Sequence, residues 1–205
     1  SWGNSMALGD NVKTLGQRLG DAGFHTAYIG KWHLDGGDYF GTGRCPPGWD
    51  PDYWYDMRRY LEELGPEDRL RSRQVETNRD PSLAADFTFG HRCSNRAIRF
   101  LESHRSEDFL LVLSYDEPHG PFLCPVPFSD MYRGCEFPRS RNVDDTLECK
   151  PEHQKVWSRA CRPDGRPPAR ITAQDFFGCN SFVDSEIGRV LDAVERTAPD
   201  ALVIY

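Results

Sequence analysis

Two short apolar runs, each of which follows a helical pattern, constrain the fold of this chain more than any other feature. The run Phe109–Tyr115 (FLLVLSY) is almost continuously apolar, and Phe24–Ile29 is rich in aromatic and β-branched residues. A continuous apolar run is typical of a strand covered on both faces, so we expect Phe109–Tyr115 to be a central, parallel strand. The run Ala201–Tyr205 (ALVIY) predicts a further buried strand.

Between these runs, apolar residues recur at three- and four-residue steps, as they do on one face of a helix. Residues 10–22 show such a face, and similar patterns predict helices over residues 53–64, 81–105 and 172–198. Strands that alternate with helices are typical of α/β proteins. We therefore predict an α/β fold with a mostly parallel central sheet and helices on both faces.

The composition excludes several classes of protein. Hydrophobic residues make up 38% and aromatic residues 12% of the 205 residues, which is enough to bury a core and argues against overall disorder. The formal net charge of -7 argues against a nucleic-acid partner. The chain has no apolar run of the length, about 18 residues, that a membrane span needs. The seven cysteines are consistent with disulfides or with free thiols, so the cellular compartment stays open.

Basic side chains follow both predicted strands. Lys31 and His33 come directly after the first strand, in the segment Gly-Lys-Trp-His, and His119 follows the second, in Glu-Pro-His-Gly-Pro. The carboxyl ends of parallel strands meet at one edge of a sheet, so these side chains are expected to surround a shared pocket. Such a pocket suits a tetrahedral oxyanion, with lysine as a point charge and histidine as a hydrogen-bond donor or general acid. The alternative is that each is an ordinary solvated loop residue.

The other histidines are interpreted as structural or superficial. His25 lies within the first predicted strand beside an aromatic residue, and we expect a structural role for it. His91, His104 and His153 are predicted to lie on the surface. Glu186 lies on the last predicted helix, where we expect it to face solvent or to form ion pairs.

Three segments resemble the sulfatase family, the formylglycine-dependent branch of the alkaline-phosphatase-like superfamily. Residues 23–34 (GFHTAYIGKWHL) resemble the second signature of that family, and residues 115–122 (YDEPHGPF) resemble its later Pro-His segment. Residues 187–191 (IGRVL) resemble its long helix before the final metal-binding strand. The resemblance implies that residues 1–205 are an internal part of one sulfatase catalytic domain, with irregular inserts at about residues 35–80 and 123–171.

The resemblance also implies a reaction, the hydrolysis of a sulfate monoester of a sugar or an aryl alcohol. Lys31 would bind a sulfate oxygen and the nucleophile, His33 would hydrogen-bond the formylglycine hydrate, and His119 would act as a general acid or a cation near the leaving group. Calcium would act as a Lewis acid on the sulfate oxygens. Two alternatives remain: a phosphonate monoester or phosphodiester hydrolase of the same superfamily, and a binding domain without catalytic activity.

The family's nucleophile motif, of the type C-x-P-x-R or S-x-A-x-R, is not found upstream of Gly30. Cys45-Pro-Pro-Gly-Trp49 has tryptophan where the motif needs arginine, and Ser158–Arg162 matches the shorter pattern but lies far downstream. We interpret the second match as chance. The formylglycine residue and the calcium ligands are therefore expected to lie outside this segment, and the segment alone is expected to be inactive.

Overall fold

Three parallel strands form the sheet that organises the molecule. The computed structural model describes residues 6–138, 141, 145–161 and 172–205, with the side chains of residues 159–161 excepted. In the sheet, β1 (His25–Gly30) lies between β2 (Trp54–Tyr55) and β3 (Phe109–Ser114). β1 and β3 pair along their full length, from His25 opposite Phe109 to Gly30 opposite Ser114. The predicted parallel sheet is confirmed.

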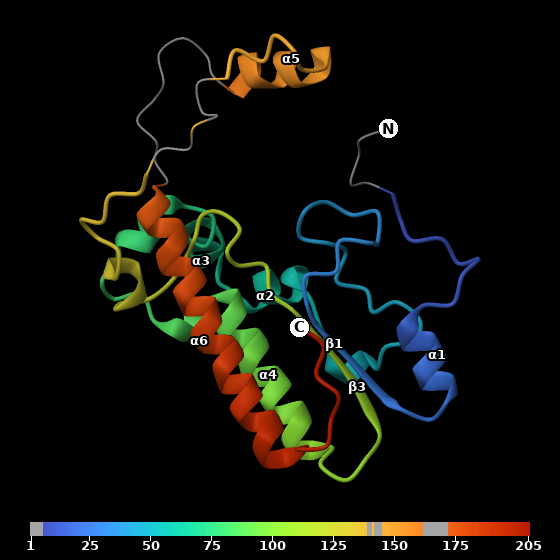
Figure 1. Ribbon diagram of the computed structural model, residues 1–205. Helices are drawn as coiled ribbons and strands as arrows, with labels where there is room; N and C mark the ends of the chain where they lie inside the picture. Colours follow the sequence, from blue (N-terminus) through green and yellow to red (C-terminus); the bar gives the residue numbers. More distant parts are fainter. Residues whose placement is uncertain (1–5, 139–140, 142–144, 162–171) are drawn as a thin grey trace.

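Helices cover both faces of this sheet (Figure 1). On one face, α4 (Phe89–Ser103) packs on the strands together with α2 (Met57–Glu63), and α6 (Ala173–Thr197) packs against α4. On the other face, α1 (Leu15–Asp21) contacts β1 beside an aromatic cluster. The cluster consists of Tyr28, Trp49 and Trp54, with Trp32 against it. The remaining helices are α3 (Pro66–Arg71) and α5 (Glu152–Cys161).

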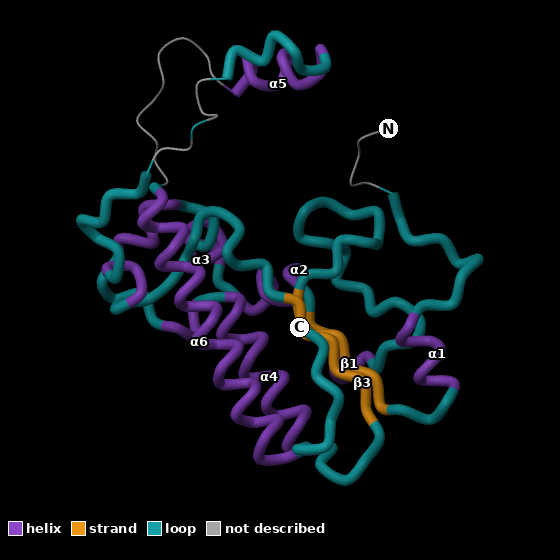
Figure 2. The backbone as a smooth tube through the Cα atoms, in the orientation of Figure 1, coloured by secondary structure: helices purple, strands orange, loops and turns teal. Residues whose placement is uncertain are grey.

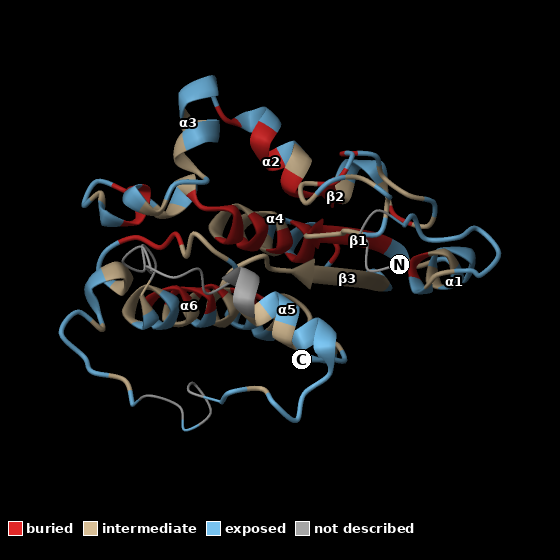
Figure 3. Cartoon of the chain, turned by 90° about the horizontal axis from the view of Figure 1, so that it is seen from above, coloured by how far each residue is buried: buried red, intermediate tan, exposed pale blue. Residues whose placement is uncertain are grey.

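The burial pattern explains why these segments are helical. The buried residues of α4 recur along its length, and Figure 3 shows this helix lying mostly buried between the sheet and α6. α6 begins at the predicted cap, since the Thr172 hydroxyl accepts from the Asp175 N–H and the Asp175 carboxylate accepts from the Thr172 N–H. α1 begins later than predicted because Thr14 and Gln17 form a capping box there. Val12 and Leu15, part of the predicted apolar face, are exposed.

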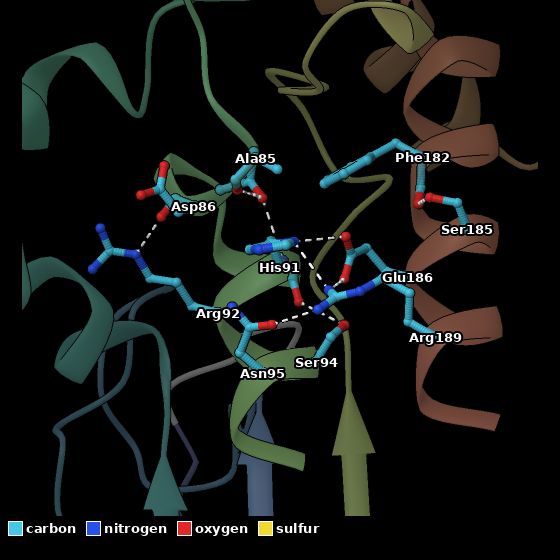
Figure 4. A network of polar contacts seen from close by, with 12 residues as sticks. Ala85, Asp86, His91, Arg92, Ser94, Asn95, Phe182, Ser185, Glu186 and Arg189 are labelled. Carbon is cyan, nitrogen blue, oxygen red and sulfur yellow. Dashed lines mark hydrogen bonds and ion pairs between the residues drawn. The ribbon is translucent and has the colours of Figure 1, made fainter. Parts of the chain in front are cut away.

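A network of polar contacts fastens α6 to α4 (Figure 4). The buried Glu186 carboxylate lies 2.7 Å from Nδ1 of His91 and 2.5 Å from the guanidinium of Arg189. The same guanidinium donates to Oδ1 of Asn95 at 2.6 Å. The ion pairing predicted for Glu186 is confirmed, but the prediction that His91 lies on the surface is wrong. The face of α4 that carries His91 packs against α6. The spacing of apolar residues within α4 alone does not predict this contact.

Two strand predictions are wrong. β3 is an edge strand of the described sheet, and all six of its residues are only partly buried. Residues 201–205 form no strand, and Figure 2 draws them as loop. Leu202 and Ile204 are each 87% exposed. An apolar run becomes a strand only when a neighbour accepts its backbone hydrogen bonds, and no described residue pairs with this one.

The two inserts differ in regularity. Residues 35–80 contain β2, α2 and α3, so the helix predicted over residues 53–64 is confirmed in a shorter form, as α2. Residues 123–171 contain only a short 3-10 turn and α5 in their described part. No described helix has the length and apolar character that a membrane crossing requires. The six cysteines whose side chains are described are free thiols, and three of them, Cys93, Cys124 and Cys179, are buried.

Candidate active site

The carboxyl end of β1 is held tightly against β3, and this fixes the backbone of Lys31. Gly30 has φ 128°, and a Cβ atom there would lie 1.9 Å from the carbonyl oxygen of Ser114, so only glycine fits. The Lys31 N–H donates to that same Ser114 oxygen at 2.8 Å. The Lys31 carbonyl accepts from the Tyr28 hydroxyl at 2.7 Å. The chain therefore leaves the sheet in one defined direction.

The structure brings the three predicted residues together around Tyr39. The ammonium of Lys31 lies 3.4 Å from the centre of the Tyr39 ring. The ring centres of His33 and His119 lie 6.2 Å and 4.8 Å from that of Tyr39. Their positions at one sheet edge agree with the sequence prediction. Their catalytic roles stay predictions.

Asp116 links the two strand ends. Its Oδ1 atom lies 2.7 Å from the ammonium of Lys31, and its Oδ2 atom accepts a hydrogen bond from the Tyr39 hydroxyl. Both side chains of the Lys31–Asp116 pair are mostly shielded from solvent. Burial, together with the neighbouring Asp116 carboxylate, raises the pKa of Tyr39, so its phenol stays protonated and serves as a donor. Lys31 is thus held in place by one carboxylate and one aromatic face.

His119 is exposed and presents one ring nitrogen outward. Its Nδ1 atom lies 2.9 Å from the carbonyl oxygen of Gly120, and its backbone N–H donates to the Asp116 carbonyl at 2.9 Å. A carbonyl oxygen only accepts, so Nδ1 carries the proton in that contact, and within the described part of the chain Nε2 has no hydrogen-bond partner. A general acid needs such an unoccupied nitrogen at the mouth of a pocket.

A cavity of about 440 Å³ opens beside His119 and Tyr39. Its walls are largely apolar, and one cation, Arg73, stacks on Phe40 with 4.6 Å between its guanidinium and the ring centre. The remaining lining residues include Met57, Tyr60, Leu61, Phe89, Asp116 and Glu117. A volume of this size suits a small organic molecule.

Glu117 is a second carboxyl group next to the candidate site, with one oxygen bonded and one not. Its Oε1 atom accepts from the Gly90 N–H at the start of α4 at 2.8 Å, whereas Oε2 is buried and has no hydrogen-bond partner among the described residues. Burial raises the pKa of Glu117 to about 7, and the Gly90 hydrogen bond offsets part of that effect. The neighbouring charges of Asp116 and Glu186 raise it further.

This raised pKa predicts that stability falls as pH rises. The pKa is about 7 in the folded chain against an ordinary value of 4.5, so the folded state holds the proton more tightly between these values. We expect Glu117 to cost the folded state about 3 kcal/mol once pH exceeds 7, and nothing below pH 4.5. Glu117→Gln should flatten the dependence of the free energy of unfolding on pH, measured by urea unfolding from pH 4.5 to 8. The exposed Glu102→Gln variant is the control, and equal slopes for the two variants would contradict the prediction.

The described residues do not supply the formylglycine nucleophile or a calcium site. Cys45 lies against the aromatic cluster on the opposite face of the sheet, and burial, with the nearby Asp50 carboxylate, raises its pKa to about 11. Its thiol therefore stays protonated, and it contacts the carbonyl oxygen of Trp49 at 3.3 Å. Arg162 of the downstream match lies outside the described residues. Calcium prefers six to eight oxygen ligands. Among the described residues, one group of three potential metal ligands lies close together, and two of its three members are histidines, so it does not suit calcium.

Sequence reasoning missed two members of the site, Tyr39 and Asp116. Asp116 could have been found, because it comes directly after the strand run and two residues after Ser114, at the edge where Lys31 was expected. Tyr39 had no such signal, since it lies in a loop rich in glycine and is placed only by how that loop folds back.

Comparison with known proteins identifies the family. The Sulfatase family model matches residues 3–205. Uncharacterized sulfatase YidJ of Escherichia coli (strain K12) is 44% identical over 199 residues, which cover 94% of this chain and 40% of that protein. Choline-sulfatase of Rhizobium meliloti (strain 1021) is 22% identical over 230 residues, with 98% and 43% coverage.

Comparison with solved structures supports the fold. The phosphonate monoester hydrolase of Agrobacterium radiobacter superposes with a TM-score of 0.55 at 18% identity, over 95% of this chain and 46% of that one. The chain thus spans less than half the length of these relatives. With the parallel sheet and the matching segments at both strand ends, the family match settles the assignment: this chain belongs to the sulfatase family and adopts part of its alkaline-phosphatase-like fold.

Proposed function

We propose that the protein containing this chain is a sulfuric ester hydrolase that cleaves a sulfate monoester of a sugar or an aryl alcohol. One observation carries the proposal: Lys31, His33 and His119 surround Tyr39 at the carboxyl edge of the sheet. The names of the relatives, which include a choline-sulfatase, support sulfate esters as the substrate class. The same family implies formylglycine as the nucleophile and calcium as a Lewis acid. In this proposal, the formylglycine residue and the calcium ligands lie outside this chain.

In this proposal, the residues divide the work by their chemistry. Lys31 places a positive charge on the sulfate oxygens, and Asp116 keeps its ammonium oriented in the free protein. His33 donates a hydrogen bond to the nucleophile's oxygen. As an imidazolium, with Nδ1 still donating to the Gly120 carbonyl, His119 gives its second proton, on Nε2, to the leaving-group oxygen as the bond between sulfur and that oxygen breaks, because an unprotonated alkoxide leaves poorly.

A phosphonate monoester or phosphodiester hydrolase is the second candidate, since a neighbour in fold carries that name. A phosphoryl group has the same tetrahedral shape as a sulfuryl group, so Lys31 and the histidines would suit both. A domain that binds such anions without turnover is the third. Matched substrates separate these candidates.

The test measures kcat/KM of the full-length protein on 4-nitrophenyl sulfate and on an aryl phosphonate with the same leaving group. We expect sulfate turnover to exceed phosphonate turnover at least tenfold. The opposite preference would assign the protein to the second candidate. Absence of turnover on both substrates would favour the binding domain and overturn the proposal.

A further inference from the structure

Three potential metal ligands meet at the opposite end of the sheet from the candidate active site. They are His25 at the start of β1, His104 directly after α4, and Glu107 in the turn to β3. Nε2 of His25 lies 3.1 Å from Oε2 of Glu107, and Nε2 of His104 lies 3.9 Å from the same oxygen. We propose that these side chains bind a divalent transition-metal ion of the zinc class.

His104 is already oriented as a ligand. Its ring is buried, with 6% of the residue exposed, and stacks on Phe100 with 4.2 Å between ring centres. Tyr53 contacts it edge-on at 5.0 Å. Its Nδ1 atom lies 2.8 Å from the Phe100 carbonyl oxygen, which only accepts, so the proton resides on Nδ1. Nε2 then carries the lone pair and faces Glu107, the arrangement in which one ring nitrogen is anchored and the other binds metal.

The backbone of all three residues is fixed as well. The Glu107 N–H donates to the His104 carbonyl at 3.2 Å, and the His25 N–H donates to the Asp108 carbonyl at 2.9 Å. His25 is also in register with Phe109 across the β1–β3 pair. A metal ion would therefore find its ligands gathered, with little further ordering of the chain.

The distances and the ligand types favour zinc over calcium. Zinc binds nitrogen and oxygen ligands at about 2.0–2.1 Å in a tetrahedron, which places ligand atoms about 3.4 Å apart. The separations of 3.1 and 3.9 Å bracket this value, and all three ligand atoms lie within 4.8 Å of one another. Two imidazoles and one carboxylate suit transition metals, whereas calcium prefers oxygen ligands alone.

The site is accessible and separate from the proposed sulfate site. The side chains of His25 and Glu107 are 49% and 48% exposed, so an ion can enter and keep a water ligand. His25 and Gly30 are the first and last residues of β1, five residue steps apart, which corresponds to about 16 Å along a strand. The competing explanation is an ion pair between His25 and Glu107 that holds no metal. That explanation predicts that these side chains bind no metal, so a Zn²⁺ titration distinguishes the two explanations.

The experiment is a Zn²⁺ titration of the full-length protein by isothermal calorimetry, repeated on His25→Ala and Glu107→Gln. Both changes lie at half-exposed side chains, and circular dichroism checks that each variant folds. Glu102→Gln, an exposed change on the neighbouring turn of α4, is the control. Other zinc-binding groups such as the exposed thiols of Cys135 and Cys149 are common to all variants, so only the difference between proteins is interpreted.

We expect the wild type and Glu102→Gln to bind one more equivalent of Zn²⁺ than the two ligand variants, or to bind it at least tenfold more tightly. The absorption of bound Co²⁺ should show the same difference. Addition of Ca²⁺ in excess should leave the difference unchanged. Identical Zn²⁺ isotherms for wild type, His25→Ala and Glu107→Gln would overturn the proposal, as would displacement of the extra equivalent by Ca²⁺.

Discussion

Replacement of Lys31 by alanine is expected to lower kcat/KM of the full-length protein by roughly 100- to 1,000-fold on every sulfate ester. The reason is that, in the proposed site, Lys31 acts on the sulfate oxygens, which all substrates share whatever the leaving group. A second effect adds to the first: the Asp116 carboxylate, 2.7 Å from the Lys31 ammonium, would lose its cation and repel the anionic substrate. The measurement is kcat/KM on a series of aryl sulfates with different leaving groups.

Two further variants separate these effects. Lys13→Ala removes an exposed lysine that pairs with the equally exposed Asp21, and should leave kcat/KM unchanged within about twofold. The double variant Lys31→Met/Asp116→Asn removes the cation and its counter-charge together. Its loss of kcat/KM should therefore be smaller than the product of the losses in the single variants Lys31→Met and Asp116→Asn. Strictly multiplicative losses would show that Asp116 acts independently of Lys31. Unchanged kcat/KM in Lys31→Ala would remove Lys31 from the site.

Replacement of His119 by alanine is expected to separate substrates by leaving group. General acid catalysis contributes about 100- to 10,000-fold, and it matters most when the leaving oxygen is strongly basic. Alkyl or sugar sulfates should therefore lose at least 100-fold in kcat/KM, and 4-nitrophenyl sulfate no more than about tenfold. The free Nε2 atom of His119 and its exposed position make it the donor in this prediction.

The check is the slope of log kcat/KM against the pKa of the leaving group, which should be steeper in His119→Ala than in the wild type. His153→Ala, at an exposed position on α5, is the matched control and should keep the wild-type slope. A parallel line shifted downward by the same factor for all substrates would exclude the general-acid role and leave His119 as a binding residue.

The sequence predicted where Lys31 and His119 lie, but it did not predict the residues that contact them, Asp116 and Tyr39. The rule that parallel strands end at one edge was enough to bring Lys31 and His119 together, although 87 intervening residues separate them in the chain. The same rule could have identified Asp116, which comes two residues after the end of β3, but Asp116 was not predicted as a partner of Lys31. Tyr39 could not be predicted, because its ring is placed by the path of an irregular loop.

The wrong predictions have a common cause, since each depends on which surface covers a segment. The apolar run of β3 predicted a central strand, yet β3 lies at the edge of the described sheet. Apolar side chains indicate that a segment is shielded from water, but not whether a second strand or another part of the chain shields it. His104 was predicted to lie on the surface because it ends a helix, but its ring folds back between Phe100 and Tyr53. Such contacts between distant segments leave no periodic pattern in the sequence.

The close approach of Gly30 to Ser114 has a consequence for how such proteins diversify. Since the Lys31 backbone is hydrogen-bonded to β3, and Asp116 follows two residues after Ser114, Lys31 and Asp116 form one stiff unit. Tyr39 reaches this unit from a separate loop. Mutations accumulating in that loop are therefore expected to reshape the space beside the unit, generation after generation, without displacing the Lys31 backbone.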